Sequence, residues 1–186
     1  MTIGEDEDSF VIFKFLETLP NLRVLDVVRL HPACLSRFIS SIQHTDLLEL
    51  VLKTDWGLVK GPPTAGIAGL EKLSINWHVY DYQNEPGNSL AHLYEFIRPT
   101  LTTLVELRIF NEPGSLLPDL DLQLLKPAAH TLRTFEYTLQ SNDESVLDTI
   151  PVIFPNLTKL SINWENTFTI HSVLWKACTN FPISHS

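Results

Sequence analysis

The chain has 186 residues and a mass of 21.1 kDa, which fits a single domain or one block of a repeat array. It contains 22 acidic and 13 basic residues, for a formal net charge of -9. That charge argues against general binding to the phosphate backbone of nucleic acids, which requires a strongly basic surface. Hydrophobic residues make up 44% of the sequence, so we expect a folded protein with a buried core.

The N-terminal segment and the cysteines favour an intracellular protein that does not cross a membrane. Residues Glu5–Asp8 are acidic, whereas a secretory signal begins with a basic segment and an apolar run. The longest apolar stretch, Phe10–Leu16, contains Lys14 and is far shorter than the roughly 20 residues that span a bilayer. Cys34 and Cys178 are distant in sequence and form no CxxC pair, so we expect reduced thiols in the cytoplasm or nucleus.

The pattern Leu-x-x-Leu-x-Leu, with other apolar residues at some positions, recurs six times along the chain. The copies are 23 to 34 residues apart. Their apolar positions are Leu22, Leu25 and Val27, then Leu47, Leu50 and Leu52, then Leu70, Leu73 and Ile75, then Leu104, Leu107 and Ile109, then Leu132, Phe135 and Tyr137, and finally Leu157, Leu160 and Ile162. The segment Lys72–Trp77 is repeated letter for letter as Lys159–Trp164, which indicates a repeated structural unit. A further copy is expected to begin at Phe181, so that the chain ends within a repeat.

Each copy of the pattern predicts a short β-strand. Apolar residues alternate with other residues in its second half, so one side of the strand faces the core and the other faces solvent. A strand this short is stable only in a sheet. The connecting segments are long enough to return the chain for a parallel neighbour, which would bury all the leucines in one continuous core. The predicted fold class is therefore α/β.

Apolar residues at three- and four-residue spacing predict helices in several connecting segments. These segments are Phe10–Leu19, Leu35–Ile42, Leu90–Ile97 and Val173–Ala177. Ser89 is placed to be the N-cap of the third helix. Residues 57 to 69 are rich in glycine and proline and predict a loop. Asp81–Asn88 is a polar insertion with turn residues, which we expect to protrude.

The pattern resembles the leucine-rich-repeat superfamily from about Phe10 to Phe181. The irregular period, the helical connections and segments such as Leu19–Leu25 are most similar to the repeats of intracellular F-box/leucine-rich-repeat proteins of the fungal type. The resemblance implies a leucine-rich-repeat solenoid of about six irregular repeats, with a curved parallel sheet on its concave side and helices and loops on its convex side. It also implies substrate recognition for an SCF-type ubiquitin ligase, although no F-box is recognisable in this sequence.

The sequence departs from the consensus of this family at one position. The consensus has an asparagine or cysteine after each strand, and its side chain bonds the backbone of the turn. The equivalent residues are Leu30, Asp55, His78, Glu112, Gln140 and Glu165. Other groups must therefore satisfy those turns.

We assign residues 1–9 to an acidic tail, 10–181 to the repeat domain and 182–186 to a C-terminal tail. The helix at Phe10–Leu16 has almost no polar face, so it is either buried on both sides or packed against something that is missing upstream. We therefore expect the repeat domain to be truncated at both ends.

No motif anchors a catalytic reaction, so we predict no enzyme activity, no cofactor and no metal. His78, His92 and Asp81 could meet at a metal ion, but ordinary polar loop residues are the simpler interpretation. Asp119 and Asp121 could place two carboxylates together, but acids at the start of a helix are more common. A divergent hydrolase or metal-dependent enzyme, or a gene fragment with no independent function, remain the alternatives.

The outward positions of the six predicted strands form the candidate site for a partner protein. They are Asp26, Val28, Val51, Lys53, Ser74, Asn76, Arg108, Phe110, Glu136, Thr138, Ser161 and Asn163. This set is mixed in charge and includes one exposed aromatic residue, Phe110, which suits protein recognition better than nucleic acid, a membrane or a small-molecule substrate. A solvated sheet face with no partner is the alternative. Trp77 and Trp164 occupy matching positions beyond the core pattern, where we expect them to pack inward.

Overall fold

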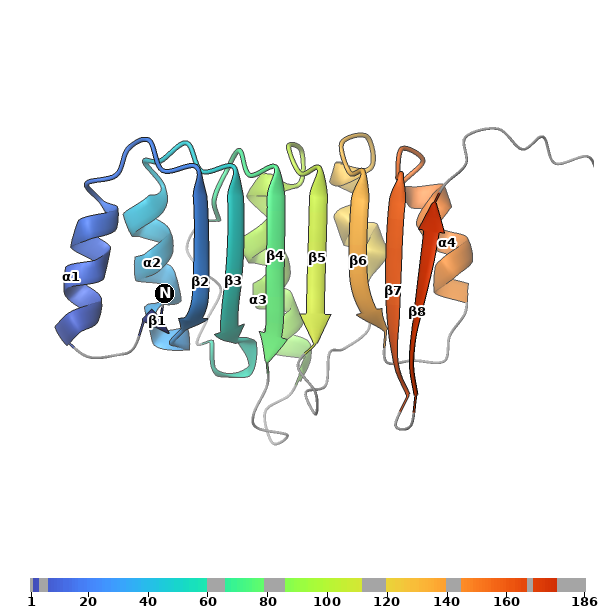
Figure 1. Ribbon diagram of the computed structural model, residues 1–186, viewed down its shortest axis with the longest axis horizontal. Helices are drawn as coiled ribbons and strands as arrows, with labels where there is room; N and C mark the ends of the chain where they lie inside the picture. The colour runs from blue at the N-terminus through green and yellow to red at the C-terminus, as the bar shows by residue number, and fades with distance from the viewer. Residues whose placement is uncertain are drawn as a thin grey trace, which may run out of the picture.

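The computed structural model describes residues 2–3, 7–59, 66–78, 86–111, 120–139, 145–166 and 169–176. Side chains are described in the ranges 10–56, 58–59, 66–77, 90–111, 120–138 and 146–163. The fold is α/β, with one layer of strands and one layer of helices (Figure 1). No helix in the described ranges is both long enough and apolar enough to cross a membrane.

The strands lie side by side in the order in which they occur along the chain, and together they form a single sheet. They are β1 (Thr2–Ile3), β2 (Val24–Leu30), β3 (Glu49–Asp55), β4 (Lys72–His78), β5 (Glu106–Asn111), β6 (Thr134–Leu139), β7 (Lys159–Asn166) and β8 (Thr169–Lys176). Neighbours from β1 to β7 are parallel, and β8 pairs antiparallel with β7. Strands β2 to β7 are the six strands that the repeated pattern predicts.

The helices all lie on one side of the sheet (Figure 1). They are α1 (Glu7–Leu16), α2 (Leu35–Ile42), α3 (Pro86–Ile97) and α4 (Ser145–Ile153), with short 3-10 helices η1 (Pro32–Cys34), η2 (Trp56–Leu58), η3 (Arg98–Thr100) and η4 (Leu122–Ala128). Each α-helix and each 3-10 helix lies in a connection between two consecutive strands. Parallel strands require such crossovers, because the chain must return to the other end of the sheet before the next strand begins.

The core is built from two rows of apolar side chains that run across the strands. The strand register aligns Leu25, Leu50, Leu73, Leu107, Phe135 and Leu160 as successive partners. It aligns Val27, Leu52, Ile75, Ile109, Tyr137 and Ile162 in the same way. Every one of these side chains is buried, which confirms the predicted strand positions and the predicted inward side.

Aromatic residues fill the wider parts of this core. Trp77 is fully buried and stacks on Trp56, with ring centroids 6.0 Å apart. Phe96 from α3 packs against Trp56 at 5.6 Å. The prediction that Trp77 packs inward is therefore confirmed, whereas the side chain of Trp164 lies outside the described residues. The buried hydroxyl of Tyr137 accepts a hydrogen bond from the Leu120 N–H at 3.3 Å, as a buried polar group requires.

The helix boundaries agree with the sequence only in part. Helix α2 spans the predicted Leu35–Ile42, but α3 begins three residues before Ser89, so the prediction that Ser89 is its N-cap is wrong. Proline is well tolerated in a first helical turn, and Pro86 opens this one. The predicted helix at Val173–Ala177 is also wrong, because β8 occupies this segment and pairs with the edge of β7. Helix α4 was not predicted.

Leu30 ends β2 and is the first of the residues at which the sequence lacks the expected asparagine or cysteine; its side chain is buried. Its carbonyl accepts a hydrogen bond from the Thr54 hydroxyl at 2.9 Å, from the next strand. The turns after β4, β5 and β6 lie outside the described residues. The same holds for the repeat expected from Phe181 and for the loop expected at Asp81–Asn88, except for residues 86–88, which belong to α3.

Glycine is required at position 66 by close neighbours and favoured at position 69 by the backbone conformation. A Cβ atom on Gly66 would overlap the Phe96 carbonyl oxygen and would lie 2.8 Å from the ring of Pro99. Gly69 has open space around it but a φ of 82°, which favours glycine. The segment that contains Gly66 can therefore lie this close to α3 only because Gly66 has no side chain.

We expect Leu73→Asp to unfold the protein, because it would place an unpaired carboxylate in the centre of the core, at a cost of more than about 4 kcal/mol. Ser74→Asp is the matched control: Ser74 is next in sequence, faces outward and is paired in register with Arg108. Its free energy of unfolding in urea should stay within about 0.5 kcal/mol of the wild type. Equal losses from the two substitutions would contradict the strand orientation.

We expect Gly66→Ala to destabilise the fold by about 1–3 kcal/mol, because α3 must shift to admit the methyl group. Gly69→Ala should cost about 1 kcal/mol through backbone conformation alone. Thermal unfolding of the two variants measures both effects. A neutral Gly66→Ala variant would show that the connection is not packed against α3.

Candidate partner-binding face

The outward side chains of β2 to β7 form the surface that we call the sheet face. The register places Asp26, Val51, Ser74, Arg108, Glu136 and Ser161 in one continuous row. A second row contains Lys53, Asn76 and Phe110, and also Thr138 paired with Asn163. Val28 lies where the register between β2 and β3 shifts, so it has no assigned partner in that row. The structure thus brings together the residues that the sequence predicts for the site.

Two of the predicted residues contribute little surface. Thr138 and Ser161 are each only 7% exposed. The Thr138 hydroxyl accepts a hydrogen bond from the Asn111 N–H at 3.4 Å, and the Ser161 hydroxyl donates one to Glu136 at 3.5 Å. Both side chains are short and lie between larger neighbours. Thr138 on β6 and Ser161 on β7 are therefore not expected to contact a partner directly.

The first residue of each strand adds a third row that the sequence analysis missed. Val24, Glu49, Lys72, Glu106, Thr134 and Lys159 are aligned by the register. Each lies two residues before a predicted outward residue, so the alternation of the strand places it on the same side. The strands begin one residue before the second leucine of the pattern, and extending the alternation by that residue would have identified this row.

Opposite charges alternate across the centre of the sheet face. The Nε atom of Arg108 lies 2.6 Å from Oε1 of Glu106 and 3.8 Å from Oε2 of Glu136 on the next strand. The Nζ atom of Lys72 lies 3.4 Å from Oε2 of Glu49. These side chains are partly exposed, so each pair contributes little to folding stability. They place side chains of opposite charge next to one another along the rows.

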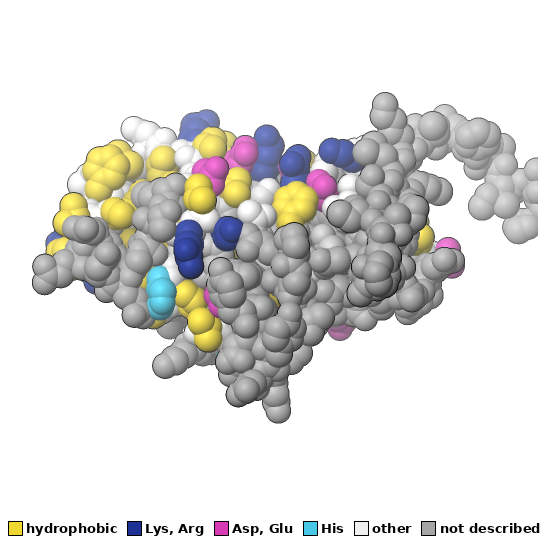
Figure 2. Space-filling view, turned by 60° about the horizontal axis from the view of Figure 1, so that its bottom comes forward, with side chains coloured by type: hydrophobic (Ala, Val, Ile, Leu, Met, Phe, Trp, Pro, Cys, Tyr) yellow, Lys and Arg dark blue, Asp and Glu magenta, His cyan; other side chains and the backbone are white. Residues whose placement is uncertain are grey.

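The sheet face combines these charges with apolar side chains. Acidic, basic and hydrophobic side chains are intermixed over the strands in the space-filling view (Figure 2). Among the described residues of the three rows, the acids Asp26, Glu49, Glu106 and Glu136 equal in number the bases Lys53, Lys72, Arg108 and Lys159. These rows have no net formal charge to attract a polyanion, but they offer directional hydrogen bonds beside apolar contacts, as protein interfaces do.

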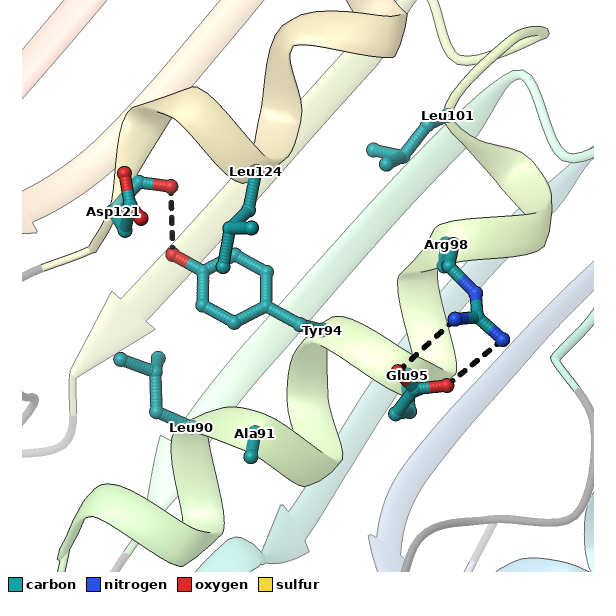
Figure 3. A pocket seen from close by; sticks show the side chains of 8 residues that line it. All are labelled: Leu90, Ala91, Tyr94, Glu95, Arg98, Leu101, Asp121 and Leu124. Atoms are coloured by element: carbon teal, nitrogen blue, oxygen red, sulfur yellow. Dashed lines mark hydrogen bonds and ion pairs between the residues drawn. The ribbon is translucent and has the colours of Figure 1, made fainter.

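A groove on the opposite side of the molecule was not predicted. It lies between α3 and η4 and has a volume of about 490 Å³ (Figure 3). Its lining residues are Leu90, Ala91, Tyr94, Glu95, Arg98, Leu101, Asp121 and Leu124. Tyr94 points from α3 across the groove, and its hydroxyl donates a hydrogen bond to the Asp121 carbonyl oxygen at 3.0 Å (Figure 3).

The polar groups of this groove already have partners within the protein. Arg98 forms an ion pair with Glu95 at 3.0 Å, and the Asp121 carboxylate accepts a hydrogen bond from the Gln123 N–H at 3.0 Å, as the N-cap of η4. Burial raises the pKa of the Tyr94 phenol well above its ordinary value, and the nearby Asp121 carboxylate adds to this effect. The groove is therefore a largely apolar depression whose polar groups Tyr94, Glu95, Arg98 and Asp121 are bonded within the protein.

The alternative metal site cannot be assembled from the described residues. In the part of the chain that the structure describes, no three histidine, cysteine, aspartate or glutamate side chains come close enough to hold a metal ion. The side chain of His78 and the whole of Asp81 lie outside that part, and so does Asp119. Asp121 caps η4, which agrees with its interpretation as an acid at a helix start.

Comparison of the chain with family models, with curated proteins and with solved structures finds no match in any of the three.

We expect the stability of the wild-type protein to fall more steeply above pH 10 than that of Tyr94→Phe. The phenol has a raised pKa in the folded protein and an ordinary value near 10 in the unfolded chain, so ionisation at alkaline pH favours the unfolded chain. Phenylalanine removes this effect, together with a hydrogen bond worth about 1 kcal/mol at neutral pH. Urea unfolding across an alkaline pH series measures both, and parallel curves would contradict the burial of Tyr94.

Proposed function

We propose that the chain is a leucine-rich-repeat solenoid that acts as a non-enzymatic protein-interaction module and binds a partner protein through the sheet face. The observation that carries the proposal is the register of six parallel strands, which aligns outward side chains in rows while the alternate side chains are buried. A surface of this kind is rigid before it binds, so little conformational entropy is lost on association.

The solenoid interpretation is supported by the order of the elements. Each unit is one strand and one crossover, and each strand pairs only with the strands before and after it in sequence. Repeats stacked in this way produce extended surfaces on which neighbouring units contribute equivalent positions. The letter-for-letter repetition of Lys72–Trp77 at Lys159–Trp164 places the same residues at equivalent positions on β4 and β7.

Arg108 and Phe110 are the best candidates for the residues that contribute most to binding. They are two residues apart on β5, close to the middle of the sheet face, and both are half-buried. Arginine and aromatic residues dominate the energetics of protein interfaces. Within the described residues, the Arg108 guanidinium meets Glu106 and Glu136 through Nε, which leaves its outer N–H groups available to a partner.

The resemblance to F-box/leucine-rich-repeat proteins supports a more specific role, in which the partner is the substrate of an SCF-type ubiquitin ligase. A recognition module of that kind needs a preformed surface and no catalytic group of its own. The preformed surface is supported by the strand register, which aligns the outward side chains in rows, and by the ion pairs of Lys72 with Glu49 and of Arg108 with Glu106 and Glu136.

The proposal is tested by capturing proteins from a lysate of the source cells with the purified chain, identifying them by mass spectrometry, and measuring the affinity of each purified candidate. Arg108→Glu and Phe110→Ala should each weaken binding by about 2 kcal/mol, or roughly thirtyfold. Leu124→Ala on the helix side is the control and should leave the affinity unchanged, because Leu124 is exposed but lies away from the sheet face.

Two results would count against the proposal. The first is a folded protein for which no candidate binds after purification, and the second is a partner whose affinity responds to Leu124→Ala but not to the substitutions on β5. The ligase role has its own test, because a substrate taken from cells treated with a proteasome inhibitor should carry ubiquitin. A partner that binds the sheet face but is never ubiquitylated would refute only that role.

A further inference from the structure

Two strands of the sheet face carry the same outward residues. Strands β4 and β7 both begin with Lys-Leu-Ser-Ile-Asn-Trp. Packing of the core accounts for the inward leucine and isoleucine, which are buried in both strands. It does not account for the outward lysine, serine and asparagine, because β2, β3, β5 and β6 each have a different set at these positions. The repetition therefore indicates a second requirement, which acts on the outer side of the sheet.

Lysine and asparagine are the accessible members of the two sets. Lys72 and Lys159 are exposed, and Asn76 and Asn163 are partly buried. Ser161 is only 7% exposed, so the serines cannot make equivalent contacts on the two strands. In each strand the lysine and the asparagine are four residues apart and lie on the same side. A partner would thus meet an ammonium group and an amide in the same arrangement at two places.

The strand register fixes the distance between the two lysines. They are the ends of a row that crosses β4 to β7 and contains Lys72, Glu106, Thr134 and Lys159. Neighbouring strands are about 4.8 Å apart, so three steps separate the lysine positions by about 14 Å. An extended chain rises about 3.4 Å per residue and turns every second side chain to the same face, so its residues i and i+4 are also about 14 Å apart. An extended segment that lies across the strands can therefore place one side chain over each lysine.

The charges along this row define the side chains that fit above it. Each lysine favours a carboxylate, because opposite charges are matched across an interface. Glu106 and Thr134 lie between the lysines, and the Glu106 carboxylate, which is 21% exposed, would repel a third acid. The residue midway between the two acids is therefore basic or uncharged. Lys72 is available to a partner, because its pair with Glu49 joins two exposed side chains at 3.4 Å and is weak.

Given the sheet face as the binding surface of the proposed function, we propose that the partner binds through an extended segment with two acidic residues four positions apart and a basic or uncharged residue midway between them. The segment crosses β4 to β7, and its two carboxylates pair with Lys72 and Lys159. Asn76 and Asn163 lie further along the same two strands, where they offer amide hydrogen bonds to the rest of the partner.

Selection from a library of random dodecapeptides displayed on phage tests the proposal. Peptides that bind the purified full chain should be enriched in pairs of acidic residues four positions apart, and the affinity of each synthesised peptide is measured by fluorescence anisotropy. Lys72→Glu and Lys159→Glu should each weaken binding by about tenfold, because each places like charges opposite each other. Both lysines are exposed, so urea unfolding should show that the variants remain folded.

The matched control is Lys126→Glu on η4, an exposed lysine on the helix side of the sheet. It changes the net charge by the same amount and should leave the affinity unchanged at physiological salt, where distant charges are screened. Exchange of charges then identifies the contacts. Replacing one acid of the peptide by lysine should restore binding to Lys72→Glu, and replacing the other acid should restore binding to Lys159→Glu. The net charge alone cannot produce this pattern, because it is the same in both variants.

Peptides that lose affinity for Arg108→Glu and Phe110→Ala but carry no spaced acids would overturn the acidic segment and leave the sheet face as the binding surface. Equal losses from Lys126→Glu and the two β-strand variants, or charge exchange that restores nothing, would have the same consequence. A selection that enriches no peptide would overturn the extended segment as the bound element. Peptides whose affinity responds only to Leu124→Ala would refute the proposed function as well, because they would bind the helix side.

Discussion

The alignment of buried apolar rows across parallel strands is the constraint on which the rest of this structure depends. Each strand is six to eight residues long in β2 to β7 and could not persist alone. Burial of Leu50, Leu73 and Leu107 beside one another fixes the register, because a shift by one residue would turn these side chains toward solvent. The same register necessarily aligns the residues between them. The rows of the sheet face are thus a direct consequence of core packing.

The differences between expectation and structure come from residues whose environment lies far away in sequence. The apolar spacing in Val173–Ala177 is compatible with a helix, but the free edge of β7 offers eight backbone partners, and β8 pairs with it. Helix α4 was not predicted, although Val146, Leu147 and Ile150 have helical spacing; it also contains Pro151, which cannot donate a backbone hydrogen bond and ordinarily interrupts a helix. Thr138 and Ser161 have the outward orientation of their neighbours, yet adjacent side chains cover them.

The sequence by itself determined the strand positions, the inward and outward sides of each strand and the order of the strands, because these follow from local alternation and from a repeat that leaves each unit beside the next. It also indicated most of the sheet face, with the exception of the row that begins at Val24. Only the tertiary structure decided which outward residues are accessible, how Arg108 is placed between Glu106 and Glu136, and where α3 and η4 leave a groove. These properties depend on distances between side chains from different repeats, which no periodic pattern encodes.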